Sequence, residues 1–207
     1  MNKQKALVVV DLQNDFCPGG SLAVSEGDTI IPVVNELLSK FDFVIFTKDW
    51  HDPKMDAFAS QHEGASPYDF YENTQGKKDI LWPDHCVADT PGADFHPDLD
   101  LSKCKKDFYI FKKGSKKDHH PYSGFGGTEL KKFLRKRGVD EVYIVGLALD
   151  YCVKDTAIDA AMAGFKTVVI EDACMPIDPN INQVLKDFKD AGVAFIESWE
   201  IPMYNLL

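Results

Sequence analysis

Short, continuous apolar runs alternate with helical patterns along most of this chain, and that alternation restricts its fold more than any other feature. The apolar runs cover residues 6–10, 43–46, 108–111, 142–145, 167–170 and 194–196. Helical spacing of apolar residues occurs in residues 30–41, 130–138, 152–164 and 181–192. Strands that are apolar throughout are buried on both faces, as in a parallel sheet covered by helices. The pattern therefore predicts an α/β fold in three layers: a doubly wound, mainly parallel sheet of six strands with helices on both faces.

One segment, at about residues 50–106, departs from this alternation. It is rich in proline, glycine, histidine and aromatic residues, and its periodicity is weak. Irregular segments of this length are uncommon in compact domains and usually have a function. We predict that this excursion covers the functional site of a single domain spanning residues 1–207, because no linker or repeat divides the chain.

Composition and charge exclude several classes of protein. The chain has 207 residues, 44% of them hydrophobic, and a formal net charge of −10. Such a charge argues against nucleic-acid and anionic-membrane partners, which need a basic surface. No apolar segment is long enough to span a bilayer, and residues 1–5 lead into an expected strand rather than a signal peptide. The five cysteines are scattered without a CxxC pair, so we expect a cytoplasmic protein without disulfides.

Four side chains with useful chemistry fall at or just past the ends of expected strands: Asp11, Asp49, Lys113 and Cys152. Ligands of open α/β sheets bind outside the carboxyl ends of the strands. We therefore expect these four side chains to converge on one site.

Cys152 stands where the strand at residues 142–145 should turn into a helix. Backbone N–H groups and the positive end of a helix dipole at that position would favour the thiolate and could hold an oxyanion. This placement indicates a nucleophile. The alternative is that Cys152 is a small buried hydrophobe, a common role of free cysteine.

Two further side chains could assist such a nucleophile. Asp11 could act as its general base, since a thiol needs a proton acceptor. Lys113 could pair with Asp11, orient it and stabilise charge. The alternatives are that Asp11 caps a loop and that Lys113 is solvated.

A second group of residues has the character of metal ligands. In an extended segment, residues two apart point to the same side, so Asp49 and His51 could bind one cation. His85 is the best third ligand, and Cys86 is expected to be buried instead. Two imidazoles and one carboxylate suit zinc, ferrous iron or manganese and leave positions open for water or substrate. The alternative to metal binding, for every histidine, is a loop residue with local hydrogen bonds. We expect that role for His62, His96, His119 and His120.

Seven segments resemble the nicotinamidases of the isochorismatase-like cysteine hydrolase superfamily. They are VVDLQNDF at residues 9–16, DWH at 49–51, WPDHC at 82–86, PGADFHP at 91–97, KG at 113–114, YSGF at 122–125 and GLALDYCV at 146–153. The resemblance implies an amidohydrolase of linear amides that converts nicotinamide to nicotinate and ammonia through a cysteine thioester, in NAD salvage. It extends to pyrazinamide as a further substrate, and it allows a homo-oligomer without giving a number of copies.

The resemblance also implies catalytic roles. Cys152 would be the nucleophile, Asp11 the base and proton shuttle, and Lys113 their electrostatic partner. The N–H groups of Ala148 and Cys152 would form the oxyanion hole, with a cis peptide bond between Leu147 and Ala148.

For the metal and the substrate, the resemblance implies a bound divalent ion to which the ring nitrogen of nicotinamide coordinates. Zinc is the expected ion, with iron or manganese as alternatives. Met55 stands where many members have another histidine, and a thioether is a poor ligand for a hard cation, so we expect only three protein ligands. The expected ligands are Asp49, His51 and His85, and the expected substrate contacts are Phe16, Trp82, Tyr122 and Gln13.

Two alternatives stay open. A metal-free relative would hydrolyse another small amide, a ureido compound or a vinyl ether, and would lack the three expected metal ligands. A non-catalytic binding module would use the same fold for protein contacts, although such proteins often lose the nucleophile.

Overall fold

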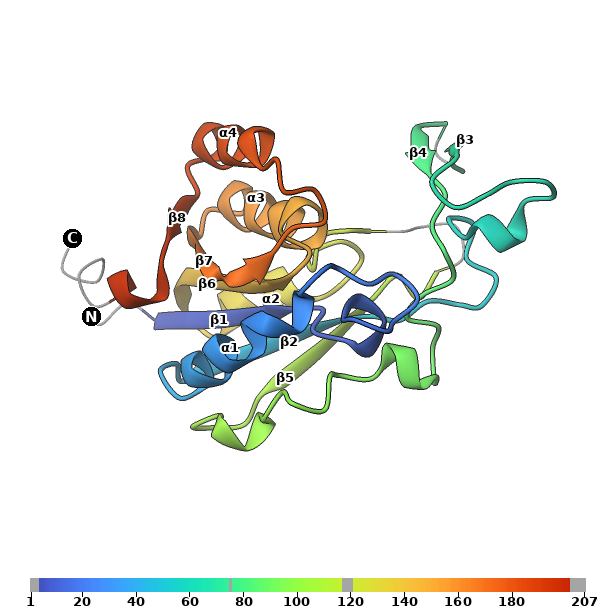
Figure 1. Ribbon diagram of the computed structural model, residues 1–207. Coiled ribbons are helices and arrows are strands. Elements are labelled where there is room, and N and C mark those ends of the chain that lie inside the picture. The colour runs from blue at the N-terminus through green and yellow to red at the C-terminus, as the bar shows by residue number, and fades with distance from the viewer. Residues whose placement is uncertain (1–3, 75, 117–120, 202–207) are drawn as a thin grey trace.

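The central element of the molecule is a six-stranded sheet (Figure 1). The computed structural model describes residues 4–74, 76–116 and 121–201. The strand order is β5-β2-β1-β6-β7-β8, and every neighbouring pair is parallel. The strands are Gln4–Val10 (β1), Phe43–Asp49 (β2), Tyr109–Lys113 (β5), Val139–Leu147 (β6), Lys166–Met175 (β7) and Ala194–Ile196 (β8). The predicted number of strands and their parallel arrangement are confirmed.

Helices cover both faces of this sheet. One face carries α1 (Ile31–Leu38), and the other carries α2 (Leu130–Lys136), α3 (Lys154–Met162) and α4 (Asn182–Ala191). Successive residues of β1 alternate between the two cores: Leu7 and Val9 pack on the α1 side, and Ala6 and Val8 on the opposite side. This alternation within a fully apolar strand confirms the three-layer prediction.

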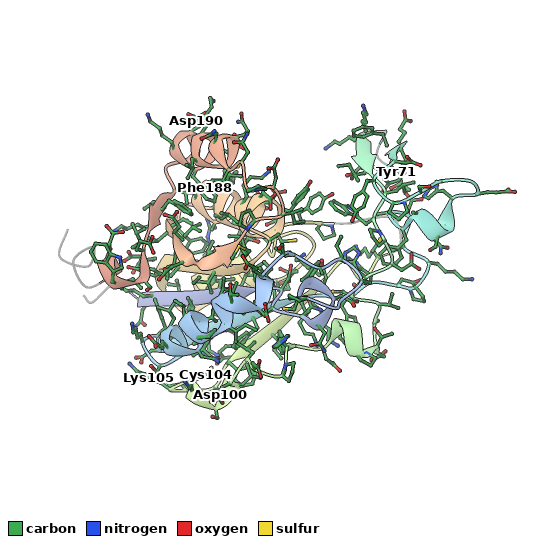
Figure 2. The ribbon with its side chains drawn as sticks, in the orientation of Figure 1. Tyr71, Asp100, Cys104, Lys105, Phe188 and Asp190 are labelled. Atoms are coloured by element: carbon green, nitrogen blue, oxygen red, sulfur yellow. The ribbon has the colours of Figure 1, made fainter. Side chains whose placement is uncertain are left out.

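The helix α4 illustrates how a surface helix contributes to the core. Phe188 is buried on its inner side, and Asp190 is exposed on its outer side (Figure 2). Among the described residues, no helix has both the length and the hydropathy needed to cross a bilayer.

The excursion at about residues 50–106 has more structure than its sequence indicated. It contains an antiparallel hairpin, β3 (Phe70–Glu72) and β4 (Lys78–Ile80), which is separate from the central sheet. Short 3-10 turns occur at Ala59–Gln61, Pro91–Ala93 and Leu101–Lys103. The hairpin gave no periodic signal because its strands have three residues each and are exposed or half-buried.

Short helical turns also connect the remaining elements. Turns of 3-10 helix lie at Asn14–Phe16, Gly27–Ile30 and Ser198–Glu200, and a π-helical turn at Leu149–Val153 links β6 to α3. The last part of the excursion, with the turn at Leu101–Lys103, runs back along α1 to the start of β5 (Figure 1). The carboxyl ends of the strands point toward its first part, which lies beyond that edge of the sheet. This is the edge at which a ligand site was expected.

Candidate active site

Lys113 is the centre of a buried charged cluster at the carboxyl edge of the sheet. Its Nζ lies 2.9 Å from Asp11 Oδ2, 2.5 Å from Asp49 Oδ1 and 3.4 Å from Cys152 Sγ. All four side chains are at most 6% exposed. The structure therefore brings together the four residues that the sequence placed at strand ends.

Strand register explains part of this convergence. Asp49 and Lys113 are direct partners on the parallel strands β2 and β5, so their side chains leave the sheet at the same level. Between β1 and β6, a Cβ at Gly146 would lie 2.0 Å from the carbonyl oxygen of Val10, and Gly146 has a φ of +118°. Only glycine permits this close approach, which brings the chain leading to Cys152 against the end of β1.

Asp11 directly follows β1 and adopts a left-handed backbone conformation, with φ +49°. Its Oδ1 accepts a 2.7 Å hydrogen bond from the hydroxyl of Thr47. Burial raises the pKa of Asp11, while the ammonium of Lys113 and the Thr47 hydroxyl oppose that rise. Asp11 is therefore a stronger base than an exposed aspartate.

Cys152 lies in the π-helical turn rather than in the first turn of a regular α-helix. Burial raises its pKa well above the usual range, and although Lys113 opposes this, the charges of Asp11 and Asp49 add to it. The expectation that this position favours the thiolate is wrong for the resting protein, because desolvation outweighs the lysine. The resting sulfur is a thiol and needs a base to lose its proton.

A second buried cluster lies on the other side of Asp49. Oδ2 of Asp49 is 3.5 Å from His51 Nε2 and 3.9 Å from His85 Nε2. One ligand atom from each of these residues lies within 4.8 Å of the other two, which suits a shared metal ion.

Hydrogen bonds to backbone carbonyls orient both imidazoles. His51 Nδ1 lies 3.0 Å from the carbonyl oxygen of Gly114, and His85 Nδ1 lies 2.7 Å from that of Pro83. In neutral rings these bonds require Nδ1–H, so each Nε2 keeps its lone pair for a metal. Burial, together with the neighbouring His51, lowers the pKa of His85 to about 4, which keeps that ring neutral. The donor set fits a divalent metal ion.

The other expected ligands and non-ligands lie as follows. Met55 is fully buried in the core. Among the described residues, Asp49, His51 and His85 form the cluster that suits a metal ion, and it contains three ligands. Cys86 is also buried, with its N–H donating to Asp15 Oδ2 at 2.7 Å. His62 and His96 make local contacts in the excursion. His119 and His120 lie outside the described residues.

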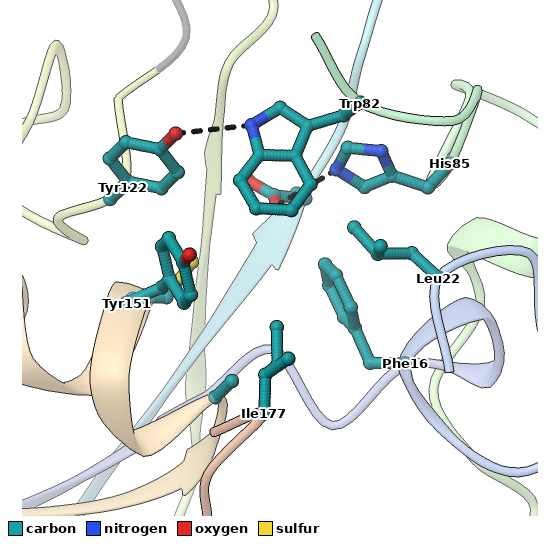
Figure 3. A pocket seen from close by; sticks show the side chains of 10 residues that line it. Phe16, Leu22, Trp82, His85, Tyr122, Tyr151 and Ile177 are labelled. Atoms are coloured by element: carbon teal, nitrogen blue, oxygen red, sulfur yellow. Dashed lines mark hydrogen bonds and ion pairs between the residues drawn. The ribbon is translucent and has the colours of Figure 1, made fainter. Parts of the chain in front are cut away.

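A cavity opens onto Cys152, Asp49 and His85 (Figure 3). Its walls are mainly aromatic and aliphatic, as in most small-molecule pockets. Three of the expected contact residues, Phe16, Trp82 and Tyr122, line it. Leu22, Tyr151 and Ile177, which were not expected from the sequence, complete the apolar wall.

Gln13 does not line this cavity, although it was expected to contact the substrate. Its Nε2 donates to the carbonyl oxygens of Asp49 and Ala93, at 2.8 and 3.0 Å, and its Oε1 accepts from the N–H of Asp49 at 2.8 Å. The carboxamide of Gln13 therefore holds the backbone at Asp49.

Ala148 and Cys152 both line the cavity, as an oxyanion site would require. The peptide bond between Leu147 and Ala148 is cis, as expected. The carbonyl oxygen of Ala148 accepts the N–H groups of Tyr151 and Val153, each at 3.1 Å. These bonds point the carbonyl of Ala148 into the turn.

Comparison with known proteins agrees with this geometry. The family model described as the isochorismatase domain matches residues 5–197 of this sequence. The chain belongs to the isochorismatase family. This family member is 43% identical over 204 residues to a nicotinamidase of Acinetobacter baylyi, an alignment that covers 95% of this chain and 94% of the relative.

Two solved structures extend the comparison. The yeast nicotinamidase bound to the inhibitor nicotinaldehyde is 36% identical, with a TM-score of 0.88, and the match covers 94% of this isochorismatase-family chain and 100% of the yeast chain. The pyrazinamidase of Pyrococcus horikoshii in complex with zinc is 39% identical, with a TM-score of 0.80, over 94% of this chain and 99% of that one.

Proposed function

We propose that this protein is a nicotinamidase, which hydrolyses nicotinamide to nicotinate and ammonia in the salvage of NAD. One observation carries the proposal: the Cys152–Asp11–Lys113 cluster and the Asp49–His51–His85 cluster share Asp49 and open onto the same cavity. A cavity with aromatic walls suits a flat pyridine ring. The relatives named nicotinamidase and the yeast structure with nicotinaldehyde support this choice of substrate.

Asp11 and Cys152 carry the proposed first step. Asp11 accepts the thiol proton. A carboxylate oxygen of Asp11 and the sulfur of Cys152 lie within 4.8 Å of each other, so small movements bring them close enough for proton transfer. The sulfur then attacks the amide carbon, forming a C–S bond while the carbonyl electrons move to oxygen. Lys113 balances the negative charge that moves between Asp11 and Cys152, because its Nζ contacts both.

The oxyanion would be held by the N–H groups of Ala148 and Cys152. In comparable enzymes, removal of one such donor costs about 2.7–4 kcal/mol of transition-state stabilisation. Asp11 returns its proton to the departing nitrogen, the C–N bond breaks, and ammonia leaves a thioester on Cys152. Asp11 then deprotonates a water molecule, whose attack breaks the C–S bond and releases nicotinate.

Asp49, His51 and His85 would hold the divalent ion, and the zinc bound in the Pyrococcus relative supports zinc as its identity. The ion would supply a Lewis-acid position for the ring nitrogen of nicotinamide. The aromatic walls Phe16, Trp82 and Tyr122 would then hold the ring in the plane that presents the carboxamide to Cys152. Orientation of this kind removes roughly 7–11 kcal/mol of barrier in good intramolecular models.

Several finer expectations belong to the same proposal. Pyrazinamide, which keeps the ring nitrogen and the carboxamide, would also be deamidated. Residues 1–207 would act as one hydrolase domain, in the cytoplasm, on a small-molecule substrate without nucleic-acid or membrane partners. Homo-oligomer formation stays a prediction that sedimentation or mass photometry can test.

The direct test is ammonia release from nicotinamide, measured before and after removal of metal by a chelator and after addition of zinc, iron or manganese. We expect activity to disappear with the metal and to return with at least one of these ions. Full activity in metal-free protein would favour a metal-free hydrolase. No ammonia from fully metallated protein would refute the proposed substrate.

A further inference from the structure

The aromatic wall of the cavity is tied to the β3–β4 hairpin by a chain of hydrogen bonds. The indole Nε1 of Trp82 donates to the hydroxyl of Tyr122 at 3.0 Å (Figure 3). The same hydroxyl donates to Oδ1 of Asp79 at 3.3 Å. Asp79 lies on β4, outside the set of residues that line the cavity.

The direction of these bonds follows from the groups involved. An indole N–H only donates, so the hydroxyl of Tyr122 accepts from Trp82 and uses its own proton for another acceptor. The carboxylate of Asp79 only accepts when ionised, which makes it a suitable end to the chain. Burial and the charge of Asp79 raise the pKa of Tyr122, so the phenol keeps the proton that it donates.

Asp79 is itself held within the hairpin. Its Oδ1 accepts the N–H of Ile80 at 2.9 Å, and its Oδ2 accepts from the side chain of Asn73 at 3.3 Å. Asn73 in turn closes the hairpin through a bond from its N–H to the carbonyl oxygen of Lys77, at 2.9 Å. The carboxylate therefore has little freedom to move away from Tyr122.

The two rings that this chain joins line the same cavity as Cys152. Trp82 is 4% exposed, and its ring centroid lies 6.3 Å from that of Tyr122 and 5.3 Å from that of Tyr151. The ring of Tyr122 is 5.6 Å from that of Tyr151. A movement of Trp82 or Tyr122 would thus change the width of the space available to a flat ring above Cys152.

We propose that Asp79 is a positioning residue. It fixes the Tyr122 hydroxyl and, through it, the indole of Trp82, and so sets the width of the space that a flat ring can occupy in the cavity. The inference rests on the proposed function for its substrate, a flat heteroaromatic amide. It assigns the hairpin a role in substrate selection, although none of the hairpin residues that the structure describes lines the cavity. Since Asp79 does not reach the reacting atoms, it should affect substrate binding more than the chemical step.

The test compares Asp79→Ala with Tyr122→Phe, which keeps the ring and removes the hydroxyl. Each change should raise the KM for nicotinamide about tenfold, the loss typical of one hydrogen bond to a charged group, and leave kcat within about twofold. The double variant should show the same rise and not a hundredfold one, because both changes break one chain. Multiplied effects, or an unchanged KM in Asp79→Ala, would overturn the assignment.

Glu72→Ala is the matched control, since Glu72 is an exposed acid on the partner strand of the same hairpin. Its KM should stay at the wild-type value, whereas a rise equal to that of Asp79→Ala would point to general loss of the hairpin. If Asp79→Ala does not fold, Asp79→Asn takes its place. That change keeps one acceptor oxygen without the charge and should raise the KM about threefold, and an unchanged KM would again overturn the assignment.

A wider amide and a spectroscopic signal complete the design. The preference for nicotinamide over quinoline-3-carboxamide, as a ratio of kcat/KM values, should fall in Asp79→Ala. The near-UV circular dichroism of Trp82, identified by its loss in Trp82→Phe, should shrink equally in Asp79→Ala and Tyr122→Phe. This signal does not depend on turnover. An unchanged band in Asp79→Ala would therefore refute the positioning role even if nicotinamide were not the substrate.

Discussion

Asp49 and Lys113 are register partners on β2 and β5, and their side chains form a 2.5 Å ion pair at the carboxyl edge of the sheet. The second oxygen of Asp49 faces His51 and His85. One carboxylate therefore joins the cysteine cluster to the metal-type cluster. The carboxylates of Asp11 and Asp49 also overcome the burial of Lys113 and raise the pKa of its ammonium.

Asp49→Asn should disturb both clusters together. Loss of the charge should weaken metal affinity by more than about tenfold, since even changes outside the ligand shell reach that size. Activity should stay low after metal is restored, because Lys113 also loses an ion-pair partner. Metal content by mass spectrometry and ammonia release check this. Glu63→Gln, at an exposed acid in the excursion, should change neither quantity.

Cys152→Ala should lower ammonia release by at least about 10³-fold, because the variant has no atom to form the thioester. Nicotinamide should still bind, as a calorimetric titration can measure, since the ring walls and metal ligands stay in place. Cys104→Ala, at a half-buried cysteine outside the cavity, should keep wild-type turnover. Turnover by Cys152→Ala near the wild-type rate would exclude covalent catalysis.

Thr47→Val should move the acidic limb of the pH profile of kcat/KM to higher pH. The Thr47 hydroxyl stabilises the carboxylate form of Asp11, so its removal raises the pKa of Asp11 further. A base must be ionised to accept the thiol proton, and with a higher pKa it is protonated, and inactive, up to a higher pH. Thr29→Val, at an exposed threonine, is the control. A limb that stays in place or moves to lower pH would show that Asp11 is not the titrating base.

Gly114→Ala should weaken metal binding without altering the ligands themselves. A Cβ at this position would lie 2.3 Å from Cε1 of His51, so the imidazole would have to move. Gly64→Ala is a matched control, because Gly64 has a similar φ, +78° against +71°, and nothing within 4 Å of an added Cβ. Both changes should cost about 1 kcal/mol of folding stability. Metal content should fall only in Gly114→Ala, and equal metal content in the two would contradict the argument.

Much of the cluster could be predicted because parallel strands end at one edge. Asp11, Asp49 and Lys113 end or directly follow strands whose apolar runs are unmistakable, and Cys152 follows a fourth. Their meeting depends on sheet geometry, which periodicity reports well. The metal ligands were harder to predict from the sequence, because His85 comes from the excursion. Its position depends on tertiary contacts such as the hydrogen bond from the Cys86 N–H to Asp15.

Other features were beyond sequence reasoning for physical reasons. The ionisation of Cys152 depends on how completely its surroundings exclude water, and the short helical pattern overstated the influence of the helix dipole. Gln13 has the hydrogen-bonding groups of a substrate contact, yet the backbone of Asp49 and Ala93 uses them. Leu22, Tyr151 and Ile177 carry no chemical signal, and only the folded shape shows that they line the cavity.

The sheet and the excursion supply different parts of the proposed chemistry. The ends of strands β1 and β5 and the turn after β6 carry the base, the lysine and the sulfur, whereas the excursion carries Trp82, proposed to wall the ring, and His85, proposed to bind the metal. Exchange of this excursion between homologues could therefore change which ligand is bound while the residues proposed to break the amide bond stay the same.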